Sequence, residues 1–177
     1  MIHKKRREEL LSKLGDDAVV IVSTNSEQKR NSDVNYPFRP DSSFWYLTGF
    51  IEPDAIAVFS KNNYSIFLRP KDKTQEIWNG VRLGVDLAPE TLLVDHAYDI
   101  DTFTDQIKIL INKESSLYFD KPTFDGWKNR ASTNTLNKTI TSIFESSIQP
   151  LNPYLSEMRL IKDATEVKNM QTAANLA

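Results

Sequence analysis

The 177-residue chain contains no cysteine and only two histidines, His3 and His96, which lie far apart in the sequence. The lack of cysteine excludes disulfide bonds, thiolate catalysis and zinc sites with cysteine ligands. The five glycines form neither a G-x-G-x-x-G pattern nor a phosphate-binding P-loop. A metalloprotease H-E-x-x-H helix and a G-x-S-x-G nucleophile elbow are missing as well. The sequence therefore indicates a domain without a catalytic centre of its own.

Long apolar runs and an excess of one charge are also absent. No window approaches the ~18 apolar residues of a membrane span, and Glu8, Glu9, Ser12 and Lys13 interrupt any signal-peptide pattern. The formal net charge is −2, from 22 basic and 24 acidic residues. Such a balance gives no general attraction to nucleic acid or to anionic membranes. We therefore expect a cytoplasmic protein with no nucleic-acid or membrane partner.

Residues 4–7 form the one dense run of basic residues. Because Glu8 and Glu9 follow it directly, the run is expected to form a solvated helix face with ion pairs one turn apart.

The residues that are present alternate between strand and helix patterns. Apolar and β-branched runs predict strands at 18–22, 44–48, 55–60, 64–68, 91–95, 117–119 and 147–151. The runs 55–60 and 64–68 are expected to pair as a hairpin. Helical spacing predicts helices at 10–14 before Gly15, at 103–111 behind an Asp101 cap, at 123–138, from an Asn152 cap with Pro153, and after Asp163.

Two polar segments, 23–33 and 70–89, are expected to be loops, the second of them protruding. Together these patterns predict an α/β fold with a mixed sheet of about five to seven strands flanked by helices.

The C-terminal end of the sequence differs in character. Val167, Met170, Ala174 and Ala177 form an apolar stripe that ends in the middle of its pattern. We therefore divide the chain into a non-catalytic α/β domain at 1–160 and a segment at 161–177. That segment is expected to be the linker and first helix of a truncated second domain.

Three stretches carry an unusual density of aromatic, proline and charged residues. They are D-V-N-Y-P-F-R-P-D-S-S-F-W-Y-L-T-G-F-I-E-P-D-A at 33–55, E-I-W-N-G-V-R-L-G at 76–84 and E-M-R-L-I-K-D-A-T-E at 157–166. In their order and spacing they resemble the N-terminal domain of aminopeptidase P, the Xaa-Pro aminopeptidases, in the wider prolidase and creatinase family. Pro40, Asn79 and Val81 depart from the family pattern. These differences affect the details of loops and not the resemblance to the family.

The resemblance implies a fold of the creatinase and aminopeptidase P N-terminal type, which is ribonuclease H-like. It also implies a following "pita-bread" catalytic domain that binds two divalent metal ions, usually Mn²⁺, through two aspartates, a histidine and two glutamates. A metal-bridging hydroxide attacks the peptide bond before a penultimate proline in such enzymes. None of those ligands can be matched in this chain, so we expect no metal or cofactor in it. The implied partners are its own C-terminal catalytic domain, proline-containing peptides and further copies in a dimer or tetramer.

The resemblance also selects candidate site residues. Trp78 is expected to line the active site of a neighbouring subunit, where an indole offers a rigid apolar face to a proline ring; the alternative is a loop anchor within its own domain. Asp33 is expected to orient an arginine of the catalytic domain near the substrate; the alternative is a local loop cap.

Four further residues are expected to be inter-domain or structural: Tyr36, Arg39, Arg82 and Arg159. For Arg39 a surface pair with Asp41 is favoured, and Arg159 is expected to fix the hinge together with Lys162. Two alternative functions stay open, the N-terminal domain of a prolidase or creatinase relative and a stand-alone binding or scaffold module of the same fold.

Overall fold

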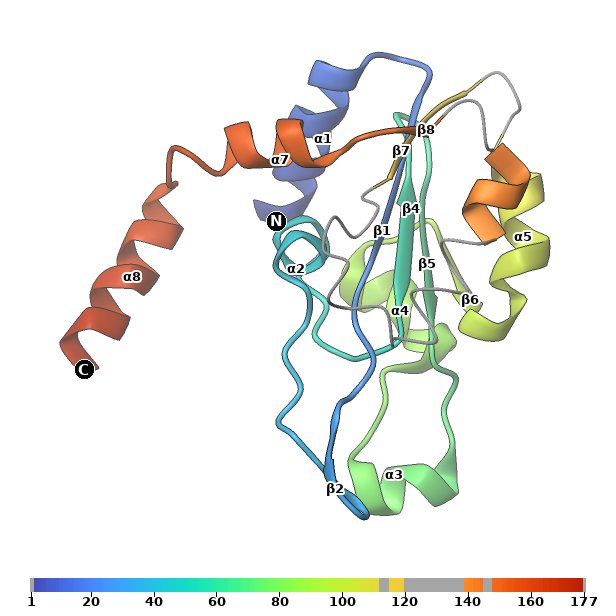
Figure 1. Ribbon diagram of the computed structural model, residues 1–177, viewed down its shortest axis with the longest axis vertical. Coiled ribbons are helices and arrows are strands. Elements are labelled where there is room, and N and C mark those ends of the chain that lie inside the picture. Colours follow the sequence, from blue (N-terminus) through green and yellow to red (C-terminus); the bar gives the residue numbers. More distant parts are fainter. Residues whose placement is uncertain (1, 112–114, 120–138, 145–147, 177) are drawn as a thin grey trace.

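The computed structural model describes residues 2–111, 115–119, 139–144 and 148–176. At its centre lies a six-stranded sheet with the order β6-β5-β4-β1-β7-β8 (Figure 1). The strands are β1 Ala18–Ser23, β4 Ile56–Phe59, β5 Tyr64–Leu68, β6 His96–Asp99, β7 Ser116–Phe119 and β8 Ile148–Gln149. β4 is antiparallel to both β1 and β5, whereas the other neighbours are parallel. The predicted mixed sheet and its hairpin are therefore confirmed.

The central strand β1 is buried on both faces, as its continuous apolar run predicts. Val20 and Val22 face one core layer, while Val19 and Ile21 face the other. The first layer is covered by α1 Ile2–Leu14, α2 Ser42–Thr48, α4 Gly84–Leu92 and α7 Asn152–Met158. The second is covered by α5 Phe103–Leu110 and a helical segment at 139–144.

Four elements, two strands and two helices, stand apart from this layered core. β2 Lys29–Asn31 and β3 Val34–Asn35 form a small separate sheet. The helices α3 Lys73–Asn79 and α8 Ala164–Leu176 bury none of their residues. None of the helices in the described part of the chain combines the length and the apolar character needed to cross a membrane.

The strand predicted at 44–48 is wrong, because these residues form helix α2. The carboxylate of Asp41 accepts hydrogen bonds from the backbone N–H groups of Ser43 and Phe44, at 2.8 and 3.0 Å, and so caps the helix. Gly49 ends it in the left-handed conformation, with φ of 72°. Capping at both ends and burial of one helical face outweigh the strand preference of the aromatic residues.

Several element boundaries also differ from the predictions. Residues 70–89 are not a plain loop, since α3 and most of α4 lie within them. The strand expected at 91–95 is found at 96–99, because α4 continues to Leu92. Within the predicted 23–33 loop, residues 29–31 form β2.

Two predicted caps are wrong as well. Asp99 rather than Asp101 caps the 3-10 turn Ile100–Thr102 that precedes α5. Asn152 is the first residue of α7 rather than its cap, while Pro153 lies in the first turn as predicted. The helix predicted at 123–138 falls outside the described residues.

The solvated face predicted for residues 4–7 is wrong for two of its four members. Arg6 and Arg7 are only 5% and 7% exposed. The guanidinium of Arg7 lies 3.7 Å above the ring of Tyr64 and donates to the carbonyl of Leu47 at 2.7 Å. Lys4 does form the expected exposed pair with Glu8, at 3.8 Å.

Tyr64 is expected to make the stability of the domain sensitive to high pH. Its hydroxyl is buried and makes no hydrogen bond within the described residues. Burial raises the pKa of Tyr64 to about 12, although the nearby Arg7 favours the ionised form. This pKa lies above the unfolded value of about 10. The contribution of neutral Tyr64 to the free energy of unfolding is therefore complete below pH 10, and it is lost as the pH rises through 12.

The measurement is urea unfolding of the chain and of a Tyr64→Phe variant at pH 8 and pH 11. Between pH 8 and pH 11, the free energy of unfolding of the native chain should fall by about 1.4 kcal/mol more than that of the variant. The largest difference, reached at still higher pH, is about 2.7 kcal/mol. At pH 8 the variant should be at least as stable as the native chain, because it loses no hydrogen bond and removes a buried hydroxyl that has no partner in the described residues. Parallel pH profiles would contradict this role of Tyr64.

Candidate functional site

The segment between β5 and α4, residues 70–83, forms an arm that carries α3 away from the sheet (Figure 1). The carboxylate of Asp72 accepts hydrogen bonds from the backbone N–H groups of Thr74 and Gln75, at 3.0 and 3.1 Å, and so starts the helix. Gly80, with φ of 85°, ends it in a conformation that other residues rarely adopt. The arm is thus a capped short helix between two extended backbone segments, which we call its limbs.

Hydrogen bonds tie the two limbs of the arm together at its base. Nη1 of Arg82 donates to the carbonyl of Pro70 at 3.1 Å, across the limbs. The backbone N–H of Arg82 donates to Oε1 of Glu76 at 3.1 Å. The N–H of Leu83 donates to Oε1 of Glu52, outside the arm, at 2.7 Å. These contacts fix the position of the base, and the inter-domain or structural role of Arg82 stays a prediction.

The outer end of the arm presents large apolar side chains to solvent. Ile77 is 77% exposed, Trp78 82% and Val81 81%. The indole of Trp78 is therefore not packed against its own domain, and the site role of Trp78 stays a prediction. Three neighbouring exposed apolar side chains are more typical of a contact surface than of scattered surface residues.

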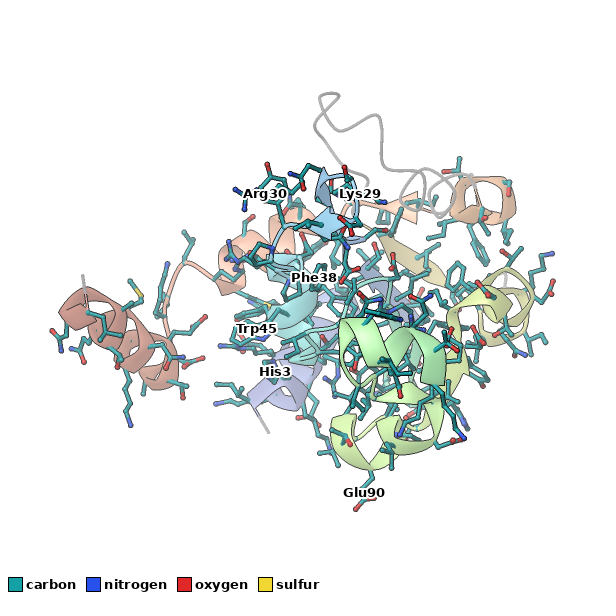
Figure 2. All side chains as sticks on the ribbon, turned by 90° about the horizontal axis from the view of Figure 1, so that it is seen from below. His3, Lys29, Arg30, Phe38, Trp45 and Glu90 are labelled. Atoms are coloured by element: carbon teal, nitrogen blue, oxygen red, sulfur yellow. The ribbon has the colours of Figure 1, made fainter. Side chains whose placement is uncertain are left out.

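The β2–β3 hairpin projects from the same end of the molecule as the arm (Figure 1). Figure 2 looks onto this end and labels Lys29 and Arg30 on the hairpin. Asp33 lies exposed in the turn, next to Ser32, whose φ is 35°. Among the described residues, the Asp33 side chain makes no hydrogen bond or ion pair. The loop cap considered for Asp33 is therefore not found, and its substrate-side role stays a prediction.

Tyr36 and Arg39 lie in the segment that leads from the hairpin to α2. Tyr36 is 54% exposed, and the guanidinium of Arg30 lies 5.9 Å from its ring centroid. Arg39 is exposed. The carboxylate of Asp41 caps α2 instead of pairing with Arg39, and within residues 2–111 no ion pair joins the two.

Arg159 follows the last residue of α7. Its guanidinium lies 5.7 Å from the ring centroid of Tyr46, and its carbonyl accepts a hydrogen bond from Nζ of Lys162 at 2.8 Å. The described contacts do not join Trp78, Asp33 and Arg159 to one another. The hairpin that carries Asp33 and the arm that carries Trp78 project from one end of the molecule, whereas Arg159 lies at the end of α7.

Comparison with known proteins assigns the family. The model of the family described as "Aminopeptidase P, N-terminal domain" matches residues 3–118. The chain belongs to this family. It is 36% identical over 177 residues to an Xaa-Pro aminopeptidase of Haemophilus influenzae, and 31% identical over 183 residues to that of Escherichia coli. Both matches cover 98% of this chain.

Solved structures agree with this assignment. A variant of Escherichia coli aminopeptidase P matches with a TM-score of 0.83 and 29% identity, covering 97% of this chain and 41% of that one. Proline aminopeptidase P II from Yersinia pestis matches with a TM-score of 0.79 and 31% identity, covering 94% and 40%. The chain spans about two fifths of the length of the curated relatives, 40% and 41% in the two cases above.

Within the part of the chain that the structure describes, the side chains of this aminopeptidase P N-terminal domain do not form a metal centre. Across the described residues, no group of three or more His, Asp and Glu side chains is arranged to hold a metal ion.

Two positions of the aminopeptidase P N-terminal domain were not predicted from the sequence. Oε1 of Glu52 accepts a hydrogen bond from the backbone N–H of Leu83, and its Oε2 lies 3.9 Å from Nη2 of Arg69. No local pattern reveals a contact that spans 31 residues. For Arg6 the charge pattern predicts a solvated face, although its spacing of four from buried Leu10 puts both on one side of α1.

Proposed function

We propose that this chain is the non-catalytic N-terminal part of an Xaa-Pro aminopeptidase, which releases the first residue of peptides with proline in second position. Two divalent metal ions, manganese by resemblance, would be held by the domain that follows. The observation that carries the proposal is the match of the whole chain to only two fifths of each Xaa-Pro aminopeptidase. The division at 160/161 and the location in the cytoplasm belong to the same proposal.

The arm is proposed to complete the substrate pocket of a neighbouring copy in a dimer or tetramer. Its exposed apolar end and its fixed base support this role. A rigid indole can pack on a proline ring with little loss of conformational entropy. The exposure of Trp78, at 82%, leaves its ring free to contact another chain.

Asp33 is proposed as the second substrate-side residue. Its carboxylate has no partner among the described residues. Asp33 lies in the turn of the β2–β3 hairpin, and this hairpin projects from the same end of the molecule as the arm. Pairing with an arginine of the catalytic domain would give a charge-assisted, directional contact near the peptide N-terminus.

A direct test compares this chain with the longer protein that contains it. With Mn²⁺, the longer protein should hydrolyse a tripeptide with proline in second position, whereas the chain alone should hydrolyse nothing. The reason is that no set of metal ligands forms within the described residues. The measurement is release of the free first residue over time.

Matched substrates separate the alternatives. Replacing proline by alanine in second position should abolish turnover, and a dipeptide ending in proline identifies a prolidase if it is the preferred substrate. Hydrolysis by the chain alone would contradict the proposal. A longer protein that binds peptides without cleaving any of them would favour the scaffold alternative.

A further inference from the structure

The helix α8 follows α7 through a short linker, and few apolar contacts hold it against the domain. Residues 159–163 connect the two helices, and Leu160 and Ile161 in this linker are 71% and 87% exposed. All the residues of α8 are likewise at least partly exposed. Apolar burial therefore does not fix the direction of α8.

The first turn of α8 is nevertheless held by reciprocal capping. Oδ1 of Asp163 accepts hydrogen bonds from the backbone N–H groups of Thr165 and Glu166, at 2.8 and 2.9 Å. In return, Oε2 of Glu166 accepts from the backbone N–H of Asp163 at 2.9 Å. This is a capping box, which uses one oxygen of each carboxylate and leaves the other free.

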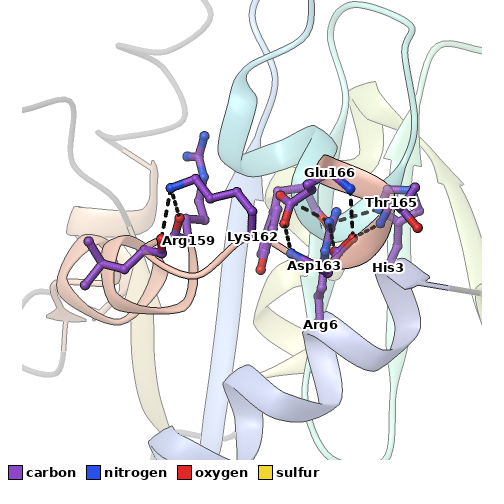
Figure 3. A network of polar contacts seen from close by, with 9 residues as sticks. His3, Arg6, Arg159, Lys162, Asp163, Thr165 and Glu166 are labelled. Atoms are coloured by element: carbon purple, nitrogen blue, oxygen red, sulfur yellow. Dashed lines mark hydrogen bonds and ion pairs between the residues drawn. The ribbon is translucent and has the colours of Figure 1, made fainter. Parts of the chain in front are cut away.

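Arg6 of α1 binds both remaining carboxylate oxygens (Figure 3). Its Nη2 lies 2.7 Å from Oδ2 of Asp163 and 3.3 Å from Oε1 of Glu166. Its Nη1 donates to the carbonyl of Tyr46 at 3.3 Å, and its guanidinium lies 3.9 Å over the Tyr46 ring. The Arg6 side chain is only 6% exposed.

This arrangement is directional because every part of it is constrained. The ring and carbonyl of Tyr46 fix the plane of the guanidinium, since a planar guanidinium stacks on an aromatic face. The guanidinium in turn engages two carboxylates that belong to one rigid helical turn. Charge-assisted hydrogen bonds to a buried arginine are strong and lose little to solvent.

We propose that Arg6 is a positioning residue that sets the direction in which α8 leaves the α/β domain. The consequence for catalysis rests on the proposed function: if α8 leads into the catalytic domain, Arg6 fixes that domain relative to the rest of this chain. The orientation of α8 itself does not depend on any peptidase activity.

The test removes the charges that Arg6 binds but keeps the helix caps. In an Asp163→Asn/Glu166→Gln variant, asparagine remains a good N-cap and glutamine can complete the capping box. The matched control is Asp86→Asn/Glu90→Gln on α4. It makes the same two chemical changes on exposed side chains that have no ion pair in the described part of the chain.

Orientation is measured as a distance distribution between two spin labels by pulsed electron paramagnetic resonance. Because the sequence has no cysteine, Glu9→Cys on α1 and Gln171→Cys on α8 provide the two labelling sites. Gln171 lies about 12 Å along the helix from Asp163, so a swing of about 45° moves its label by about 9 Å. The distribution should be narrow in the native chain and in the control.

In Asp163→Asn/Glu166→Gln the distribution of label distances should broaden about two-fold or more. In this variant the linker alone holds α8 to the domain, and Gln171 lies far along the helix from it. The helix content by circular dichroism should be unchanged. An Arg6→Met variant should show the same broadening; if it does not fold, the carboxylate variant alone decides, because its side chains are partly exposed. An unchanged distribution in the folded carboxylate variant, or a broad one in the native chain, would overturn the inference. A longer protein without peptidase activity would overturn the proposed function only.

Discussion

Replacing Trp78 by alanine in the proposed full-length aminopeptidase is expected to lower kcat/KM for Xaa-Pro peptides by roughly five- to 150-fold. That range corresponds to about 1–3 kcal/mol, the contribution of packing part of an indole against a proline ring. The loss should be larger for peptides long enough to contact the arm. The measurement is steady-state kinetics with tripeptide and longer substrates.

The same substitution should leave the stability of the domain almost unchanged. Trp78 is 82% exposed, and α3 buries none of its residues, so little packing is lost on truncation. Ile109→Ala provides a control, because Ile109 is a comparably exposed apolar residue of another helix, α5. It should change neither kcat/KM nor Tm. An unchanged kcat/KM together with a lowered Tm for Trp78→Ala would make Trp78 a loop anchor.

The core of the fold could be predicted from the sequence because its signals are local. A run of apolar, mostly β-branched residues at 18–22 predicts a strand buried on both faces, and β1 has that environment. The hairpin of β4 and β5 follows from two apolar runs separated by polar turn residues. The family was recognised from three motifs in the correct order, which together are far more specific than any one of them.

The errors occur where a tertiary contact outweighs a local preference. Arg6 and Arg7 belong to a charged run, but the phase of α1 turns them towards the same side as Leu10 and Leu14. There a tyrosine ring satisfies each guanidinium. The helical phase of α1 correctly indicates that Arg6 and Arg7 are buried, whereas the charge pattern favours their exposure to solvent.

The candidate site shows the same limit. Trp78 and Asp33 could be selected from the motifs, but the base of the arm depends on Glu52 and Arg82, whose partners lie elsewhere in the chain. The polar character of residues 70–89 favours a loop and hides the helix within the arm, although Asp72 marks its start. A site that depends on a second domain or a second copy cannot be completed from the contacts of one chain.

Residues 44–48 form a helix rather than the predicted strand. The two conformations differ in which side chains they bury, so mutations that change stability distinguish them. In α2, Phe44 and Leu47 lie one turn apart, and both are fully buried at 0% exposure. Trp45 is 40% exposed and meets the ring of His3 edge-on at 5.4 Å. A strand would instead place Phe44 and Leu47 on opposite faces, because successive side chains alternate.

Phe44→Ala is expected to lower the free energy of unfolding by about 3–5 kcal/mol and Leu47→Ala by about 2–5 kcal/mol, since each leaves a cavity in a close-packed core. Trp45→Ala, the matched control between them, should cost about 1 kcal/mol, mostly from the lost ring contact. Urea unfolding of this chain at neutral pH measures all three. A typical domain has about 5–15 kcal/mol of stability in total, so either core substitution removes a large share of it. If Trp45→Ala cost as much as Phe44→Ala while Leu47→Ala cost little, the helical phase of α2 would be contradicted, because burial would no longer follow the three-residue spacing that joins Phe44 to Leu47.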